Sequence, residues 1–242
     1  AITGATNQTY SVPTNLAVGT YQYTVSATTG GVTVTSGPAT ITVFANPVPE
    51  LSVQTGQHYW CVNNPIQTVL TTTPYAIYQW MLDGVNITGA TNQTYSVPTN
   101  LPVGTYQYSV RVVNSNGCSG VNAAINNISI IVYPAPAPTI NVIGPATWCS
   151  NNPGTTTLST ASGLASYQWM LNNTNITGAT NNTYQVPTSL SAGTYSYTVQ
   201  VTNTNGCSGT SSAQTITVFS QPEVTVNTTG GNSFCQGASS RP

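Results

Sequence analysis

Few side chains in this 242-residue sequence could take part in acid–base chemistry. Only 2% of residues are charged and lysine does not occur, so the ionisable set apart from tyrosine and cysteine is Arg111, Arg241, Glu50, Asp83, Glu223 and His58. Nucleophilic catalysis needs a base beside the nucleophile, and paired carboxylates are needed for glycoside hydrolysis; this set supplies neither. We therefore expect no enzyme, no cofactor and no metal site. A basic surface for nucleic acid and an acidic cluster for calcium are equally absent.

The sequence repeats itself at a long period. The phrase Ile-Thr-Gly-Ala-Thr-Asn-x-Thr-Tyr begins at Ile2, Ile87 and Ile176, so the spacings are 87 − 2 = 85 and 176 − 87 = 89 residues. Solenoid repeats are about 20 to 50 residues long, whereas a period of this size suits a small domain that buries its own core. The sequence therefore predicts independent modules arranged in tandem.

Proline-rich junctions mark the expected module edges. We expect the C-terminal half of a module in residues 1–46, complete modules in residues 47–134 and 135–220, and the start of a further module in residues 221–242. On this interpretation the sequence is a window on a longer array. A less favoured alternative is that neighbouring chains exchange half-modules.

Five cysteines occupy two positions of the repeat: Cys61, Cys149 and Cys235 lie early, and Cys118 and Cys207 lie late. Bridges within modules would join Cys61 to Cys118 and Cys149 to Cys207. Bridges from a late cysteine to the next early one would instead leave Cys61 without a partner. We favour bridges within modules, closing loops of 118 − 61 = 57 and 207 − 149 = 58 residues. Each would stabilise its module by roughly 3 to 4 kcal/mol and indicates an oxidising, extracytoplasmic setting.

The elements that carry these residues are expected to be strands. Alternation of apolar and polar residues in 106–112, in 21–25 and in 195–201 is typical of strands with one buried face. Asn-Gly at 116–117 and 205–206, and Asp-Gly at 83–84, favour tight hairpin turns. Short strands and frequent turns predict an all-β fold of tandem immunoglobulin-like antiparallel β-sandwiches joined by short Pro-rich linkers.

Several motifs resemble a known family. Tyr-Gln-Trp in an early strand, Gly-Thr-Tyr-x-Tyr in a late one, Cys-x-x-Asn-Pro and Asn-Gly-Cys-Ser-Gly together resemble the immunoglobulin-like or PKD-like repeats of large surface proteins of gliding, type IX-secreting bacteria, including motility adhesins. The resemblance implies a core tryptophan and a tyrosine corner. The matching residues are Trp80 and Trp169 for the tryptophan, and Tyr106 or Tyr108 with Tyr195 or Tyr197 for the tyrosine.

Tyrosine and tryptophan often stack on sugar rings, but most of those in this sequence alternate inward and are expected in cores. Tyr59, Trp60 and Tyr75 do not fall on an expected inward face, so they are the candidates for a ligand contact. His58 beside them has no counterpart in the next module, which favours a structural role in an edge strand.

The function expected from these features is structural and adhesive: an extracellular stalk in a cell-surface adhesin or filament. Its expected partners are other copies or neighbouring repeats, because no lysine protects the edge strands from pairing, with surface polysaccharide as a second partner. No apolar run is long enough to cross a membrane. The alternative is a carbohydrate-binding or spacer region of a secreted polysaccharide-degrading enzyme.

Overall fold

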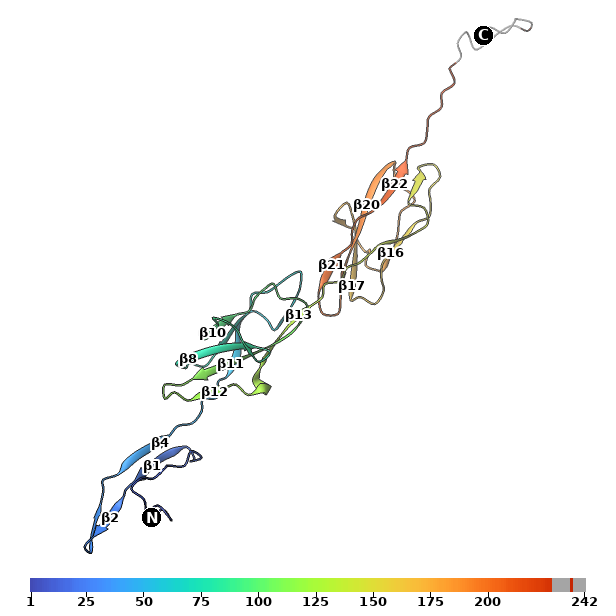
Figure 1. The fold of residues 1–242 in the computed structure, drawn as a ribbon. Helices are drawn as coiled ribbons and strands as arrows, with labels where there is room; N and C mark the ends of the chain where they lie inside the picture. Colours follow the sequence, from blue (N-terminus) through green and yellow to red (C-terminus); the bar gives the residue numbers. More distant parts are fainter. Residues whose placement is uncertain (228–235, 237–242) are drawn as a thin grey trace. The chain divides into compact units, whose positions relative to one another are not determined.

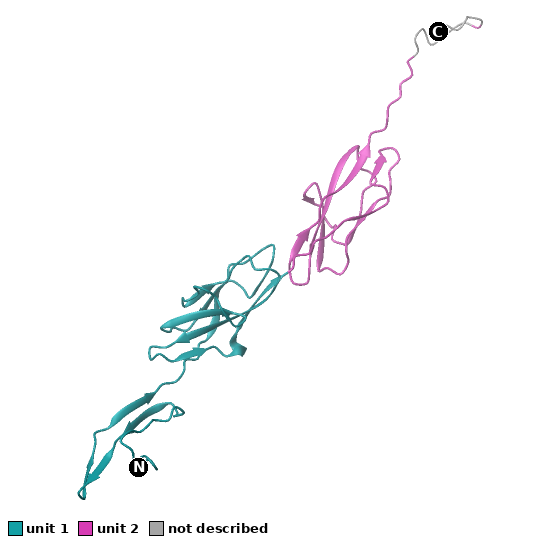
Figure 2. Cartoon of the chain, in the orientation of Figure 1, with its two compact units in different colours: residues 1–133 teal, residues 134–242 magenta. Residues whose placement is uncertain are grey.

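The computed structural model describes residues 1–227 and residue 236, and it divides into two compact units, residues 1–133 and 134–242 (Figure 2). Strands dominate, and the described helical structure is a 3₁₀ turn at Ala124–Asn126. The expected fold class, tandem immunoglobulin-like antiparallel β-sandwiches with Pro-rich linkers, is confirmed. The described part of the chain holds no helix with the length and hydropathy that a bilayer crossing requires.

The module within the first unit, called module two, is a sandwich of two sheets (Figure 1). One sheet has the order β10-β7-β5, and the other has the order β6-β13-β11-β8-β9 with β12 paired to β11. These strands are β5 Leu51–Thr55, β6 Tyr59–Cys61, β7 Val69–Thr72, β8 Ile77–Leu82, β9 Val85–Asn86, β10 Thr94–Ser96, β11 Gly104–Val113, β12 Ser119–Val121 and β13 Ile128–Tyr133. All pairs are antiparallel except β6 with β13, which run parallel.

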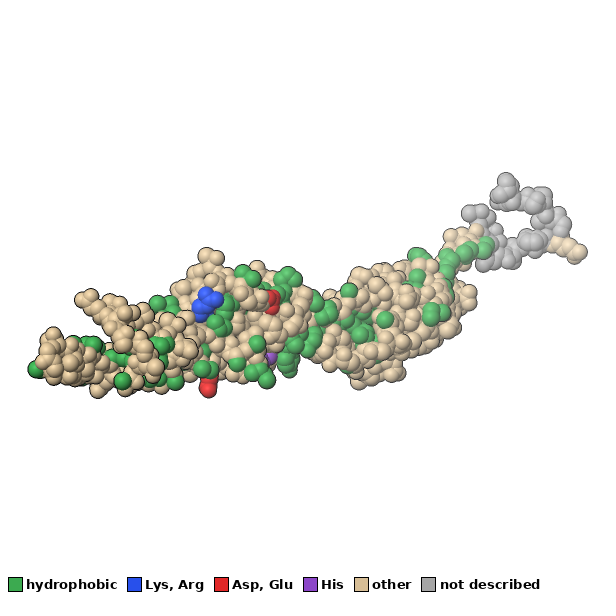
Figure 3. Space-filling view, turned by 60° about the horizontal axis from the view of Figure 1, so that its bottom comes forward, with side chains coloured by type: hydrophobic (Ala, Val, Ile, Leu, Met, Phe, Trp, Pro, Cys, Tyr) green, Lys and Arg blue, Asp and Glu red, His purple; other side chains and the backbone are tan. Residues whose placement is uncertain are grey.

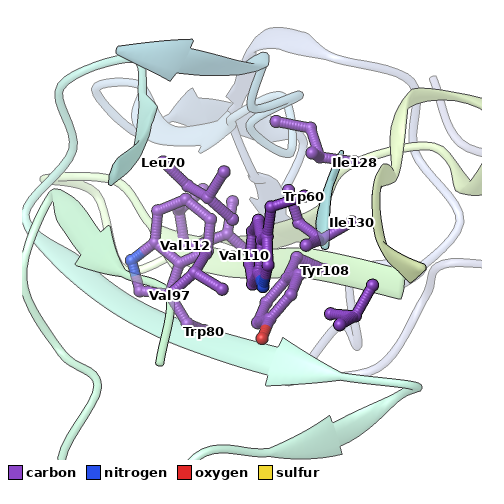
Figure 4. Packing of buried hydrophobic residues seen from close by; sticks show 10 residues of the cluster. Trp60, Leu70, Trp80, Val97, Tyr108, Val110, Val112, Ile128 and Ile130 are labelled. Carbon is purple, nitrogen blue, oxygen red and sulfur yellow. The ribbon is translucent and has the colours of Figure 1, made fainter. Parts of the chain in front are cut away.

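Module two buries an aromatic and aliphatic core between its sheets. Trp80 and Tyr108 are completely enclosed, and the ring of Tyr95 lies between them, with centroids 5.9 Å and 5.7 Å away respectively. Figure 4 shows that the buried apolar side chains of module two converge on the space between its two sheets. Large rings remove more apolar surface from water than any other side chains, so this cluster supplies much of the stabilisation of the module.

The second unit contains module three, which repeats the same topology. Its sheets have the orders β14-β16-β19 and β15-β22-β20-β17-β18, with β21 paired to β20. The strands are β14 Asn141–Ile143, β15 Thr147–Cys149, β16 Thr157–Ser159, β17 Ser166–Leu171, β18 Thr174–Asn175, β19 Thr183–Gln185, β20 Gly193–Thr202, β21 Ser208–Thr210 and β22 Gln214–Phe219. Trp169, Tyr184 and Tyr197 form the same aromatic row, with centroid distances of 6.0 Å and 5.8 Å.

Residues 1–46 hold a smaller set of strands: β1 Gly19–Tyr23 pairs with β4 Ala39–Val43, and β2 Ser26–Thr29 pairs with β3 Val32–Thr35. No side chain of residues 1–46 is fully buried, and most are exposed. Val25, for example, is 63% exposed, whereas the valine at the same place in the repeat of module two, Val110, is completely buried. These strands form two separate two-stranded sheets, without the facing sheet that covers the cores of modules two and three.

A glycine allows the chain to pass from one sheet to the other near the start of each module. Gly56, between β5 and β6, has φ +90°, and a Cβ there would meet the carbonyl oxygen of Gln67. Gly144, between β14 and β15, has φ +102° and faces the carbonyl oxygen of Thr155. L-residues rarely adopt such a backbone, and here there is also no room for a side chain. Glycine is therefore required at the crossing.

The repeated Ile-Thr-Gly-Ala-Thr-Asn phrase has a structural explanation in the tryptophan strand. Trp80 donates its backbone N–H to Ala90 (2.9 Å) and accepts from the N–H of Ile87 (2.9 Å), while its indole Nε1 donates to the carbonyl of Asn92 (2.9 Å). Trp169 makes the corresponding bonds in module three, including Nε1 to the carbonyl of Asn181 at 2.9 Å. The phrase thus satisfies the polar groups of a buried strand and ring.

The strands at the sheet edges are short, and they carry no lysine. The strands at the four edges of module two, β9, β6, β10 and β5, have two, three, three and five residues, and the register of β5 shifts between Val53 and Thr55. Short or bulged edges offer few consecutive hydrogen-bonding groups to another chain. Strand length thus provides the edge protection that the sequence, which lacks lysine, does not provide through charge.

Candidate functional site

The cysteines show a pairing that differs from the expected one. Cys61 and Cys207 are disulfide-bonded, whereas Cys118 and Cys149 carry free thiols. The predicted bridges of Cys61 with Cys118 and of Cys149 with Cys207 are therefore wrong. The alternative bridge of Cys118 with Cys149 is also wrong. Cys235, the fifth cysteine, lies outside the described residues.

The physical reason is that each module holds its two cysteines at opposite ends. In module three, Cys149 is the register partner of Phe219 at the end of β22, beside the start of β20. Cys207 follows the far end of β20 and lies in the hairpin between β20 and β21. β20 has ten residues and therefore spans about 30 Å, whereas a disulfide needs Cα atoms about 4 to 7 Å apart.

The hairpin that carries the late cysteine is held by an asparagine. The side-chain oxygen of Asn203 accepts from the N–H groups of Asn205 and Cys207, both at 3.0 Å, and its Nδ2 donates to the carbonyl of Pro134 at 3.1 Å. Asn114 does the same in module two for Asn116 and Cys118. The late cysteine is thereby fixed at the end where the chain enters its module.

The three aromatic candidates for a ligand contact divide on burial. Trp60 is 2% exposed and belongs to the core, because β6 pairs with β13 and turns the indole inward; it cannot stack on a ligand. Tyr59, its neighbour, points the other way and is 51% exposed, with the ring of Tyr133 at 6.0 Å. The expectation for Trp60 is thus wrong, whereas Tyr59 remains available at the surface.

Tyr75 is half-buried and packs against the core of module two. Its backbone N–H donates to the hydroxyl of Tyr78 at 2.7 Å. A hollow of about 420 Å³ adjoins it, lined by Pro74, Tyr75, Ala76, Asn114 and Ser115. The lining contains no charged side chain, so the hollow offers shape and amide groups but no acid or base.

Figure 3 shows how sparsely charged side chains are distributed over one face of the described molecule. Asp83 has a structural partner, because its carboxylate accepts from the N–H of Gln107 at 3.0 Å; the uncharged Asn172 does the same for Ser196 at 3.1 Å in module three. Within residues 1–227 and 236, no three His, Cys, Asp or Glu residues gather in a group that could hold a metal ion.

Two tyrosines of each late strand have different roles. Tyr106 and Tyr195 donate their hydroxyls to the carbonyls of Pro102 and Ser191, both at 2.8 Å, which is the tyrosine-corner geometry. Tyr108 and Tyr197 are fully buried, and neither hydroxyl has a hydrogen-bond partner in the described structure. The open choice of corner tyrosine is thus settled in favour of Tyr106 and Tyr195.

Burial disfavours ionisation of the core tyrosines. It raises the pKa of Tyr108 well above its ordinary value near 10, and the neighbouring Tyr95, Tyr106 and Asp83 raise it further. In module three, burial followed by repulsion from Tyr184 and Tyr195 raises the pKa of Tyr197 to about 12. These shifts arise from desolvation inside a core and not from a cleft, so they do not indicate catalysis.

Comparison with protein families matches residues 135–218, essentially module three, to the PKD-like domain. The chain is an immunoglobulin-like repeat region. A search of curated proteins found no match.

Solved structures with similar folds include fibronectin(III)-like modules of Clostridium thermocellum CbhA, with 14% identity, a TM-score of 0.37, and coverage of 71% of this chain and 94% of that one. A 1.5-MDa bacterial ice-binding adhesin shows 15% identity, a TM-score of 0.39, and coverage of 73% and 65%. The Bacteroides ovatus protein SGBP-B, solved with a mixed-linkage heptasaccharide, shows 18% identity, a TM-score of 0.26, and coverage of 72% and 48%. With TM-scores below 0.5, these likenesses carry no argument about function.

Proposed function

We propose that this chain is a non-catalytic, structural repeat region of an extracellular cell-surface adhesin or filament, in which the modules act as an extended stalk. The observation that carries the proposal is the direction of the chain through each module. In module three the chain is held at Pro134 beside the end of β20 and leaves after β22, beside the start of β20. Modules with this connection extend an array by their full length.

The chemistry of the modules suits a mechanical role outside the cell. Their stability comes from aromatic cores and backbone ladders, which salt and mild pH changes affect little, because few charged groups are present to screen or titrate. Cys61 and Cys207 are disulfide-bonded, and disulfides form and persist in oxidising compartments. Export by a gliding, type IX-secreting bacterium is the finer form of this proposal, and it rests on the resemblance of the repeat motifs. Module boundaries at residues 46/47, 134/135 and 220/221 belong to the same proposal.

A second candidate function is binding of a surface polysaccharide, favoured by the exposed ring of Tyr59 beside Tyr133. The corresponding residues of module three are Thr147 and Phe219, so the pair is not a property of the repeat. A binding function shared by all modules would not depend on it.

A glycan array probed with the whole chain separates the two candidates. The stalk proposal expects no selective signal above that of a matched Tyr59→Ala variant. Selective binding of one glycan class that Tyr59→Ala abolishes would instead establish the carbohydrate-binding function. The same preparations, followed by light scattering at micromolar concentration, test the expected self-association; strict monomers at every concentration would contradict the filament form of the proposal.

A further inference from the structure

The last strand of each module pairs with one of its first strands, and the two run in the same direction. In module two, β6 is parallel to β13, with Tyr59 in register with Ile131 and Cys61 in register with Tyr133. The other strand pairs described in module two are antiparallel. Module three repeats the arrangement with β15 and β22. Strands near opposite ends of the module's sequence are thus joined side by side.

Hydrogen bonds fix both ends of this short pair. Just before β6, the carbonyl of His58 accepts from the N–H of Ile131 at 2.8 Å. Just after β6, the N–H of Val62 donates to the carbonyl of Tyr133 at 2.9 Å. The corresponding bonds of module three join Thr217 to Ala146 at 3.0 Å and Ser150 to Phe219 at 2.9 Å.

A buried indole anchors the first strand of the pair in the core of its module. Trp60, the middle residue of β6, is 2% exposed and lies among the core residues (Figure 4), and Trp148 of β15 is 7% exposed. Sliding either strand along its axis requires the ring to leave its packed position. A tryptophan buries about 150 to 250 Å² of surface, so a strand of three residues is held by more than its backbone bonds.

The direction of the two strands determines how a pull on the ends of a module reaches them. A pull on the preceding chain draws β6 back toward its N-terminal end, whereas a pull on the following chain draws β13 onward toward its C-terminal end. Because the strands are parallel, these two pulls slide one strand along the other and load all the bonds between them together. Strands pulled apart from one end would instead lose their bonds one at a time.

The strand that precedes β6 is held less firmly. β5 belongs to the facing sheet, where it pairs with β7, and its register shifts between Val53 and Thr55. Its apolar residues Leu51 and Val53 are half-buried, so releasing β5 exposes less apolar surface than releasing β6 with its fully buried Trp60. The pair of β6 with β13 therefore holds the beginning of the module to its end after β5 has yielded.

We propose that this parallel pair, β6 with β13 in module two and β15 with β22 in module three, is the part of each module that resists a pulling force. The inference rests on the proposed stalk function, because a stalk is loaded between its ends. It also gives a role to the repeated Cys-x-x-Asn turn. The N–H of Asn64 donates to the carbonyl of Cys61 at 2.9 Å, and Asn152 does the same for Cys149, so the turn closes each first strand directly after the pair.

Stretching of the whole chain at constant force, with reductant present so that no disulfide carries load, tests the inference through the lifetime of each module. Val62→Pro and Ser150→Pro each remove one N–H of the pair at an exposed position, and each follows a strand residue, whose extended backbone suits a following proline. We expect each variant to shorten the lifetime of one module about fivefold, the factor that one net hydrogen bond gives.

Tyr106→Phe is the matched control for these variants. It removes the hydrogen bond from its hydroxyl to the carbonyl of Pro102, which lies outside the parallel pair. It should lower the equilibrium stability of module two by a similar amount. Its lifetime under force should nevertheless stay unchanged, because that bond is still intact when the pair separates.

A milder variant decides the question where proline prevents folding. Tyr59→Thr introduces the residue that module three carries at this position, Thr147, and removes the ring contact with Tyr133 across the pair, 6.0 Å between centroids. The lifetime of module two should shorten at least about twofold. Tyr75→Leu also introduces a residue of module three, Leu164, but outside the pair, and should not shorten it.

The outcomes separate this inference from the stalk function on which it rests. Lifetimes in Tyr59→Thr and in the folded proline variants that equal those of the unmodified chain would overturn the inference and leave the stalk function in place. An equal shortening in Tyr106→Phe or Tyr75→Leu would overturn it as well, because the resistance would then belong to the whole module. Unmodified modules that open without measurable resistance would overturn both.

Discussion

At the scale of single residues, the paired tyrosines of β11 show how position in a strand determines what a hydroxyl contributes. Tyr106 places its hydroxyl on the carbonyl of Pro102, whereas the hydroxyl of Tyr108 is buried without a partner in the described structure. A net hydrogen bond contributes about 1 kcal/mol, while a buried unpaired polar group costs about 1 to 3 kcal/mol. The same substitution should therefore lower stability at Tyr106 but not at Tyr108.

We expect Tyr106→Phe to lower the free energy of unfolding of module two by about 1 kcal/mol. Tyr108→Phe should leave it unchanged or raise it by about 1 kcal/mol, because no hydrogen bond is lost. Hydrogen-exchange mass spectrometry in increasing urea checks both, since peptides from each module report separately. A larger loss for Tyr108→Phe than for Tyr106→Phe would contradict the assignment of the corner.

Buried tyrosines also set the alkaline limit of stability. The pKa of Tyr197 is raised to about 12, whereas the unfolded chain titrates near 10, so the unfolded state loses its proton first as the pH rises. Stability is therefore complete below pH 10 and falls above it, by about 1.4 kcal/mol per pH unit for each such tyrosine. Urea midpoints should be flat between pH 5 and pH 9, given so few other charges, and should decline between pH 10 and pH 12. A Tyr197→Phe variant should decline less steeply, and an equal decline would contradict this cause.

At the scale of elements, the crossing between the two sheets depends on one backbone conformation. Gly56 combines a positive φ with contact against the carbonyl of Gln67, whereas Gly84 in the turn between β8 and β9 has a positive φ but open space around it. Gly84→Ala should cost about 1 kcal/mol for the backbone alone. Gly56→Ala should cost at least about 3 kcal/mol, because the added methyl group must displace the backbone at Gln67 and Thr68, just before β7. Equal costs, measured as urea midpoints, would show that the crossing tolerates rearrangement.

Sequence reasoning succeeded where one element determines the outcome. Period-2 alternation identified β1, β11 and β20, and the Asp83-Gly84 and Asn116-Gly117 turns lie between strands as expected. It failed for Trp60, because a three-residue strand offers too little alternation to show which face is buried. The parallel pairing of β6 with β13 decides that orientation, and a pairing between segments about 70 residues apart leaves no local pattern.

The prediction of the cysteine pairing failed for a related reason. Counting cysteines weighs which partners are present, but the choice between them depends on which end of a ten-residue strand each one occupies. One signal was readable in the sequence: the late cysteines follow the long Gly-Thr-Tyr strand by only a few residues, so they must lie at its far end. The position of the early cysteines beside the last strand, by contrast, required the fold.

For the whole molecule, the proposed role as a stalk requires that each module resist a pulling force with its own core. Strands β5 to β13 of module two span residues 51–133, and strands β14 to β22 of module three span residues 141–219. Each of these segments of roughly 80 residues would reach about 270 Å when fully extended.

The most direct measurement is single-molecule stretching of the whole chain between its two termini in the presence of reductant. We expect two separate unfolding events, one for each module, and each should release a contour length of somewhat less than about 270 Å. Extension without any resisting event, or one event that releases both modules together, would contradict the proposal that independent modules bear the force.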